Sequence, residues 1–164
     1  MPTPAPRVSI RMGSATDWET MIEAKKVLDE FGVASEALVL SAHRTPDAAI
    51  AHSASAIERG IKVIIAGAGG AAHLAGVLAA KTILPVIGVP CATTSLAGFD
   101  SLLAIVQMPK GTPVATVAVG KPGAANAGFL AVQMLALSDP ALAKKLYERK
   151  AKARDEVLAT RLPV

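Results

Sequence analysis

The sequence predicts an α/β fold with three layers, a doubly wound (flavodoxin- or Rossmann-like), mostly parallel sheet and a C-terminal helix. Short apolar runs alternate with segments of helical periodicity, which is the pattern of consecutive β-α units. The run Val-Ile-Ile-Ala at 63–66 is unbroken, as expected for a strand that is buried on both faces of a parallel sheet. Clusters of glycine and proline separate these runs and indicate tight turns.

The individual elements follow from turn residues and apolar spacing. In 17–31 apolar side chains recur every three or four residues, and Asp17 stands where it can cap that helix. Thr45 and Pro46 are typical of a helix start, and Gly60 ends that helix after residue 59. Strands are expected at 8–12, 37–40, 63–66, 86–89, 105–108 and 114–119. Helices are expected at 17–31, 46–59, 74–82, 95–103, 124–137 and 140–158.

The charge distribution argues against a nucleic-acid partner. The net charge is +4, but residues 1–143 hold equal numbers of basic and acidic side chains, so residues 144–164 supply the whole excess. A basic surface confined to one terminal helix, with Tyr147 as its single aromatic residue, is more typical of a solvated face than of a polyanion site.

The middle of the chain suggests subunit contacts. Between residues 63 and 138 only four side chains are charged: Lys81, Asp100, Lys110 and Lys121. A monomer of this size needs more polar side chains to cover its surface, and subunit interfaces are poor in charge. The sequence therefore predicts a homo-oligomer.

The chain has one cysteine, Cys91, so no internal disulfide is possible and a reducing compartment is favoured. The N-terminal residues lack the basic and apolar regions of a signal peptide. Lys81, Pro85 and Pro90 interrupt the longest apolar stretches before they reach the length of a membrane span. We expect a cytoplasmic protein without a membrane partner.

The first candidate site follows the first strand, at Gly13-Ser14-Ala15-Thr16-Asp17. A helix N-terminus offers free N–H groups and partial positive charge, which attract phosphate. Asp17 would repel a phosphate and suits a ribose hydroxyl better. A plain helix cap explains this segment equally well.

The second candidate site is the loop Ser41-Ala42-His43-Arg44 after the second strand. Arg44 can direct two donors at a phosphate, and His43 can take up or release a proton. A lone histidine is more often structural. The position of the His-Arg pair at the carboxyl end of a strand favours a catalytic role, since ligands of such sheets bind there.

The third candidate site, from Gly67 to His73, matches the G-x-G-x-x-A dinucleotide fingerprint. That motif also needs an acidic residue at the end of the next strand, and residues 87–91 contain none. The remaining interpretation is a glycine-rich loop whose backbone can lie close against a flat ligand, with His73 at the end of the loop.

Other chemistries find little support in the sequence. His43, His52, His73 and Cys91 lack metal-ligand spacing, and a structural role is expected for His52. The sequence has no P-loop motif of NTPases and no G-x-S-x-G elbow of serine hydrolases. Cys91 is expected to be a buried packing residue rather than a nucleophile.

Six collinear segments of the chain resemble the PurE family of purine biosynthesis. They are MGSATDW at 12–18, SAHRTPD at 41–47, VIIAGAGGAAHL at 63–74, DSLL at 100–103, IVQMP at 105–109 and GAANA at 123–127. Together they cover about residues 8–158, and their specificity is high.

The resemblance implies interconversion of N5-carboxyaminoimidazole ribonucleotide and 4-carboxy-5-aminoimidazole ribonucleotide, without a metal or organic cofactor, in a homo-octamer. It implies that the carbamate group of N5-carboxyaminoimidazole ribonucleotide loses carbon dioxide and that ring carbon four captures this carbon dioxide. A histidine matched by His43 would then remove the proton from ring carbon four. Phosphate and ribose would bind at the matched positions Ser14, Asp17 and Arg44. The resemblance also implies that Ser41, Gly69 and His73 line the rest of the pocket.

The resemblance has departures and leaves alternatives open. Ala75 replaces a usual proline, Thr16 replaces serine, and Arg11 occupies a normally apolar strand position, where it could loosen the first strand. A direct aminoimidazole ribonucleotide carboxylase that uses free carbon dioxide is the nearest alternative, although the bacterial-type segments favour the mutase. A non-catalytic nucleotide-binding module is the other.

Three regions are expected along the chain. Residues 1–7 form a flexible N-terminus, and residues 8–138 form a single α/β nucleotide-binding catalytic domain. Residues 139–164 form a C-terminal helix and tail that pack on a neighbouring subunit.

Overall fold

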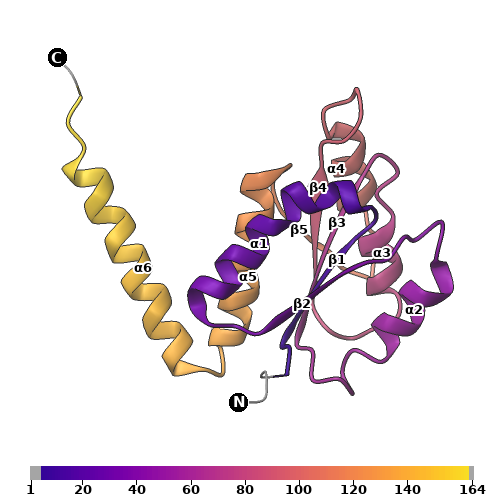
Figure 1. Cartoon of the computed structure of the whole chain (residues 1–164), viewed down its shortest axis with the longest axis horizontal. Helices are drawn as coiled ribbons and strands as arrows, with labels where there is room; N and C mark the ends of the chain where they lie inside the picture. The colour runs from indigo at the N-terminus through magenta and orange to yellow at the C-terminus, as the bar shows by residue number, and fades with distance from the viewer. Residues whose placement is uncertain (1–4, 163–164) are drawn as a thin grey trace.

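The computed structural model describes residues 5–162, in which one sheet of five parallel strands forms the centre (Figure 1). Its strands are β1 (Val8–Met12), β2 (Ser35–Val39), β3 (Val63–Gly69), β4 (Val86–Cys91) and β5 (Ala115–Thr116). They lie in the order β2-β1-β3-β4-β5. This is the doubly wound order of flavodoxin-like folds, so the predicted fold class is confirmed.

Helices cover both faces of the sheet. α1 (Trp18–Phe31) and α5 (Lys121–Ala136) pack on one face. α2 (Pro46–Ala54), α3 (Leu74–Ala79) and α4 (Phe99–Val106) lie on the other face (Figure 1). α6 (Pro140–Ala159) begins against α5 and then runs away from the body (Figure 1).

Alternation along the strands divides the core into two layers. Successive side chains of a strand point to opposite faces, so Val63 and Ile65 of β3 join the core under α1 and α5. Ile64 and Ala66 join the core under α2, α3 and α4. On β1 the same alternation directs Arg11 to the α2 side of the sheet, where it is buried against other polar groups.

Some predicted boundaries are wrong. No strand forms at 105–108, because Ile105 and Val106 are the last residues of α4 and Ile105 packs against Gly88 of β4. A short apolar run does not by itself distinguish a strand from a buried helical turn. The helix expected at 95–103 begins at Phe99, after Gly98 with φ +89°.

Other elements differ in length from the prediction. β3 continues through Gly69, so the glycines expected in a loop complete a strand. α2 ends at Ala54, where the prediction continued to residue 59. Asp17 does not cap α1 with its side chain. A 3-10 turn, η1 (Ala15–Asp17), precedes α1, and Ser14 is its N-cap.

The predicted terminal regions fall partly outside the described residues, at 1–4 and 163–164. Within the described part, the backbone N–H of Arg7 donates to the Ala34 carbonyl at 2.8 Å. In α6 Leu142 is the only buried residue among those that the structure describes. No helix within residues 5–162 is long and apolar enough to cross a membrane.

Candidate active site

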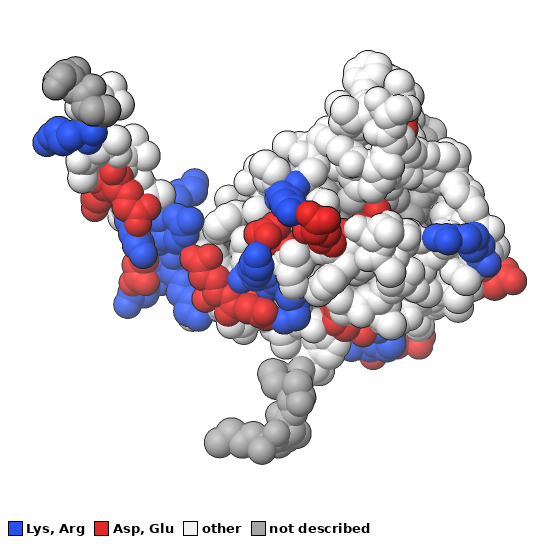
Figure 2. Space-filling model, turned by 45° about the horizontal axis from the view of Figure 1, so that its top comes forward, with Lys and Arg blue, Asp and Glu red and all other residues white. Residues whose placement is uncertain are grey.

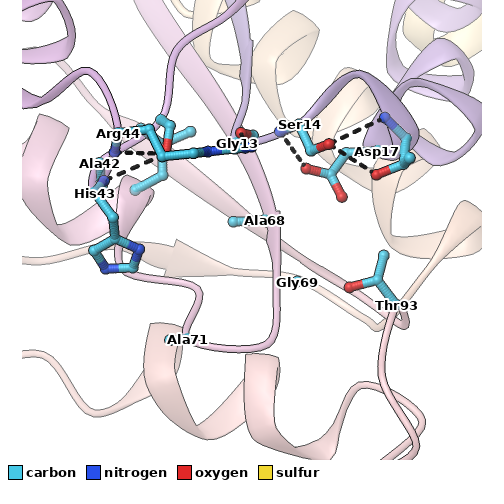
Figure 3. A pocket seen from close by; sticks show the side chains of 13 residues that line it. Gly13, Ser14, Asp17, Ala42, His43, Arg44, Ala68, Gly69, Ala71 and Thr93 are labelled. Carbon is cyan, nitrogen blue, oxygen red and sulfur yellow. Dashed lines mark hydrogen bonds between the residues drawn. The ribbon is translucent and has the colours of Figure 1, made fainter.

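The main candidate site is a cavity of about 310 Å³ at the carboxyl ends of β1 and β3, beside β2 (Figure 3). This edge of the sheet is the switch point of the doubly wound order, where ligands of such folds bind. The cavity is lined by Gly13, Ser14, Thr16, Asp17, Ser41, Ala42, His43, Arg44, Ala68, Gly69, Ala71, Leu74 and Thr93. The volume lies at the lower end of the range that is usual for small-molecule sites.

The turn after β1 is held by a capping box between Ser14 and Asp17. The Ser14 backbone N–H donates to Asp17 Oδ2 at 2.9 Å, and the Thr16 N–H donates to Ser14 Oγ at 3.4 Å. The Thr16 hydroxyl also donates to Ser14 Oγ, at 2.9 Å. The turn therefore places a hydroxyl and a carboxylate side by side on the cavity wall (Figure 3).

Asp17 is the buried charged group of the cavity, with 3% of its surface exposed. Burial raises the pKa of the Asp17 carboxyl above its ordinary value, against hydrogen bonds from the backbone of Ser14 and Gly13 and the positive charge of Arg44. Asp17 Oδ2 is occupied by the Ser14 N–H. Its other oxygen can accept a hydrogen bond from a ligand hydroxyl.

The loop after β2 is organised by Ser41. Its Oγ accepts from the backbone N–H groups of His43 at 3.3 Å and Arg44 at 3.1 Å. The guanidinium of Arg44 donates to the Gly13 carbonyl at 2.7 Å. These bonds join the loop after β2 to the turn after β1, so the two candidate sites predicted from sequence form one wall.

His43, which lines the cavity, is in direct contact with His73. His43 Nε2 lies 2.8 Å from His73 Nδ1, and the ring planes meet at 86°. One ring must donate and the other accept, because each nitrogen carries either a proton or a lone pair. His73 immediately precedes α3 and lies outside the cavity lining, so it reaches the site through His43.

The glycines of β3 allow close packing rather than dinucleotide binding. A Cβ on Gly67 would lie 2.2 Å from Met21 Sδ, so Gly67 fits beneath α1. A Cβ on Gly69 would lie 1.7 Å from Thr93 Oγ1. α3 begins only at Leu74 and has six residues, unlike the long helix that opens at the glycines of a dinucleotide fold.

Thr93 is a polar site residue that the sequence did not predict. It follows β4, lines the cavity, and directs its hydroxyl towards Gly69 (Figure 3). No motif marks Thr93, because its place in the site depends on a contact between two different loops. The position of Thr93, just past the carboxyl end of a strand, is the only signal in the sequence.

A second cavity, of about 410 Å³, shares four residues with the first. Its lining consists of Gly13, Ser14, Ala15, Val39, Ser41, Arg44 and Thr45. Ser14, Ser41 and Arg44 therefore line both cavities.

Within residues 5–162, no three His, Cys, Asp or Glu side chains are grouped so that they could hold a metal ion.

Comparison with known proteins identifies the family. A family model described as AIR carboxylase matches residues 7–156. The chain belongs to the AIR carboxylase family. This membership confirms the family resemblance of the six sequence segments.

Several curated relatives share more than half of their residues with this member of the AIR carboxylase family. One from Bacillus subtilis (strain 168) is 60% identical and covers 93% of this chain and 94% of its own. One from Saccharolobus solfataricus is 54% identical, and the match covers 96% of this chain and 98% of that relative. Both are named N5-carboxyaminoimidazole ribonucleotide mutase. The crystal structure of Treponema denticola PurE superposes with a TM-score of 0.83 at 24% identity, covering 93% and 94% of the two chains, and shows the shared fold.

Two departures from the family pattern are accommodated in the core. Ala75 is buried in α3 and packs towards Gly88 of β4. Arg11 does not interrupt the first strand, since β1 pairs with β2 and β3 along its whole length.

Cys91 is fully buried, and burial together with the charge of Asp17 raises the pKa of its thiol to about 12. A thiol with this pKa stays protonated near neutral pH and is a poor nucleophile.

Proposed function

We propose that the chain interconverts N5-carboxyaminoimidazole ribonucleotide and 4-carboxy-5-aminoimidazole ribonucleotide, as a carboxyl-shifting mutase of de novo purine (IMP) biosynthesis. The observation that carries this proposal is the set of mutases that are 52–60% identical over nearly the whole chain. The cavity supports it, since an acid-base histidine, an arginine and two serines lie around one small-molecule site.

The phosphate and ribose of the substrate bind along the wall formed by the first two loops. Arg44 and the Ser14 hydroxyl hold the phosphate, because a guanidinium and a neutral donor complement its charge. Asp17 accepts a hydrogen bond from a ribose hydroxyl through the oxygen that the Ser14 N–H leaves free. Ser41 keeps this wall in shape through its bonds to His43 and Arg44.

His43 carries the proton transfer. When the carbamate C–N bond breaks, carbon dioxide leaves and the exocyclic nitrogen takes up a proton from His43. Ring carbon four then bonds to the carbon dioxide, and His43 removes the proton that this carbon loses, so no net proton is gained or released. The hydrogen bond to His73 orients the His43 ring and can share its proton.

The wall opposite the first two loops confines the carbon dioxide. Ala68 and Ala71 present only methyl groups and Gly69 has no side chain, so the aminoimidazole ring can lie flat against β3. Gly69 also leaves room for Thr93, whose hydroxyl faces the same space. A close fit excludes water, and the intermediate is then captured before it escapes. No metal or organic cofactor takes part.

The enzyme works in the cytoplasm as a homo-oligomer, which the family resemblance implies is an octamer. Charged side chains gather on α6 and the adjoining part of the body, with others along the lower edge and at the right, while the upper part of the visible face carries almost none (Figure 2). Large apolar side chains are exposed on the low-charge segment, including Ile83, Leu96, Phe99 and Leu137. α6 packs on a neighbouring subunit, which would cover its exposed Tyr147 and Leu158.

Separate incubation of the purified protein with each substrate tests the reaction. We expect turnover of the carbamate without added bicarbonate. Efficient turnover of aminoimidazole ribonucleotide with bicarbonate, and none of the carbamate, would instead identify a direct carboxylase. Binding of the nucleotide without turnover of either substrate would identify a non-catalytic module.

A further inference from the structure

A second group of ionisable side chains lies away from the cavity, on the α2 side of the sheet. It consists of Arg11 on β1, Glu36 on β2, His52 on α2 and Arg59 in the turn after α2, named here the Arg11 cluster. Three of these side chains meet at Glu36 Oε1: Arg11, Arg59 at 2.7 Å and His52 at 3.2 Å. Arg11 also contacts His52 Nε2, and Arg59 donates to the His52 carbonyl at 3.0 Å.

The Arg11 cluster surrounds a guanidinium that is shielded from solvent. The Arg11 side chain is 1% exposed and that of Glu36 is 23% exposed. Burial raises the pKa of Glu36, but the hydrogen bond from Arg59 and the charge of Arg11 outweigh it and bring the pKa to about 2. A buried guanidinium that loses its carboxylate is strongly destabilised, so the Glu36 carboxylate is needed to keep Arg11 in this position.

α2 depends on this cluster because it has little apolar anchorage. Ala49 and Ser53 are the buried residues of the helix, and both side chains are small. Ser53 donates to the Leu78 carbonyl at 2.8 Å, which ties α2 to α3. The contacts of His52 and Arg59 with Glu36 tie α2 and its following turn to the sheet.

Each segment of the cluster leads directly to the candidate active site. Gly13 lies two residues after Arg11, immediately past the end of β1, and its carbonyl accepts a hydrogen bond from Arg44. Glu36 lies on β2, and two residues past the end of that strand Ser41 accepts hydrogen bonds from the backbone of His43 and Arg44. Thr45 follows this loop as the N-cap of α2, so a displacement of α2 moves the loop.

We propose that the Arg11 cluster sets the position of α2, and through it the positions of His43 and Arg44. Arg11, Glu36, His52 and Arg59 are thus positioning residues, and they touch no substrate. The inference deepens the proposed function and rests on it for the effect on turnover. The effect of the Arg11 cluster on the geometry of the His43 loop does not depend on which reaction the site performs.

Glu36→Gln is the principal test, since it keeps the shape of the side chain and removes the charge shared by both arginines. We expect kcat to fall about 10- to 100-fold, because small displacements of catalytic groups have effects of this size. A crystal structure of the variant should show α2 shifted and the contact between His43 and His73 broken. Glu36→Asp, which keeps a carboxylate, should retain more activity than Glu36→Gln.

Val27→Ala is the matched control, because Val27 lies in the core on the opposite face of the sheet. The Val27→Ala and Glu36→Gln variants are assayed under conditions in which each is fully folded. An equal loss of kcat in Val27→Ala and Glu36→Gln, with the His43–His73 contact intact in both, would overturn the proposal. If Glu36→Gln does not fold, Arg59→Gln replaces it, since Arg59 is more exposed, and a smaller effect in the same direction is expected.

The outcomes separate this inference from the proposed function. If the parent protein turns over neither substrate, the proposed function fails. The crystal structures still decide whether the Arg11 cluster positions the loop. If the parent is active and the loop is unmoved in the variant, the positioning role alone is wrong.

Discussion

His43 Nε2 and His73 Nδ1 lie 2.8 Å apart, although the two residues are thirty positions apart in the chain. His43 belongs to the loop after β2, and His73 stands four residues after the end of β3. Since β2 and β3 are the two neighbours of β1, this contact connects the segments that follow the strands on either side of β1. The parallel order of the sheet therefore brings two histidines from distant segments into contact.

Gly69→Ala tests the close approach of β3 to Thr93. A Cβ at residue 69 would lie 1.7 Å from Thr93 Oγ1 and 2.9 Å from Thr93 Cβ. We expect a loss of stability of about 1–3 kcal/mol, as for other overpacked sites, and an increased KM as Thr93 is displaced. Urea unfolding and steady-state kinetics measure the two effects.

Thr93→Gly provides the companion to this test. Combined with Gly69→Ala, it removes the obstructing side chain, so the double variant should be less destabilised than the sum of the single changes. Gly13→Ala is the control for stability, since a Cβ there meets Ala68 and Asp17 at an ordinary 3.7 Å. Equal losses of stability in Gly69→Ala and Gly13→Ala would contradict the packing argument.

Asp17→Asn is expected to stabilise the free protein near neutral pH while weakening nucleotide binding. Because burial raises the pKa of Asp17 in the native state, the native state binds that proton more tightly than the unfolded state. The unfolding free energy of the parent therefore falls as the pH rises through the native pKa. The variant does not titrate at this position, so its advantage should grow from below pH 3.8, the ordinary pKa of the group, towards neutrality.

Denaturant unfolding of both proteins across this pH range measures the difference. Glu58→Gln, at an exposed position, controls for the loss of one carboxylate. If the difference between Asp17→Asn and the parent does not change with pH, the assigned effect of burial is wrong.

Light scattering tests the proposed oligomer. We expect a mass several times that of one chain at micromolar concentration. Leu158→Glu should lower this mass, because it places a charge on the exposed apolar part of α6 that we assign to a neighbouring subunit. Lys152→Glu, on the same helix, is the control for added negative charge. A monomeric parent protein would overturn the oligomer proposal.

The sequence predicts those parts of the site that follow from local rules. Ser14 and Asp17 stand between a strand and a helix, and His43 and Arg44 precede a Thr-Pro helix start, so turn chemistry places them at the correct edge of the sheet. The structure brings all four to one cavity. Ser41, predicted as pocket wall, lines the cavity and also bonds to the backbone of its own loop.

The features that sequence reasoning missed depend on distant contacts. Thr93 enters the site only because Gly69, on another strand, has no side chain. Arg11 looks misplaced in a strand until Glu36 and His52, 25 and 41 residues away, are folded against it. The apolar segment at 105–108 has no periodicity long enough to separate a helix end from a strand.

The central claim, that His43 performs the proton transfers of a carboxyl shift, is tested most directly by His43→Asn. We measure conversion of the carbamate by the parent and the variant, and nucleotide affinity in the same preparations. Ala48→Gln, at an exposed position of α2, is the control. The account predicts that His43→Asn lowers kcat by at least about 10²–10⁴-fold, the range of general acid-base groups, with affinity largely kept. Near-normal turnover by His43→Asn would contradict it.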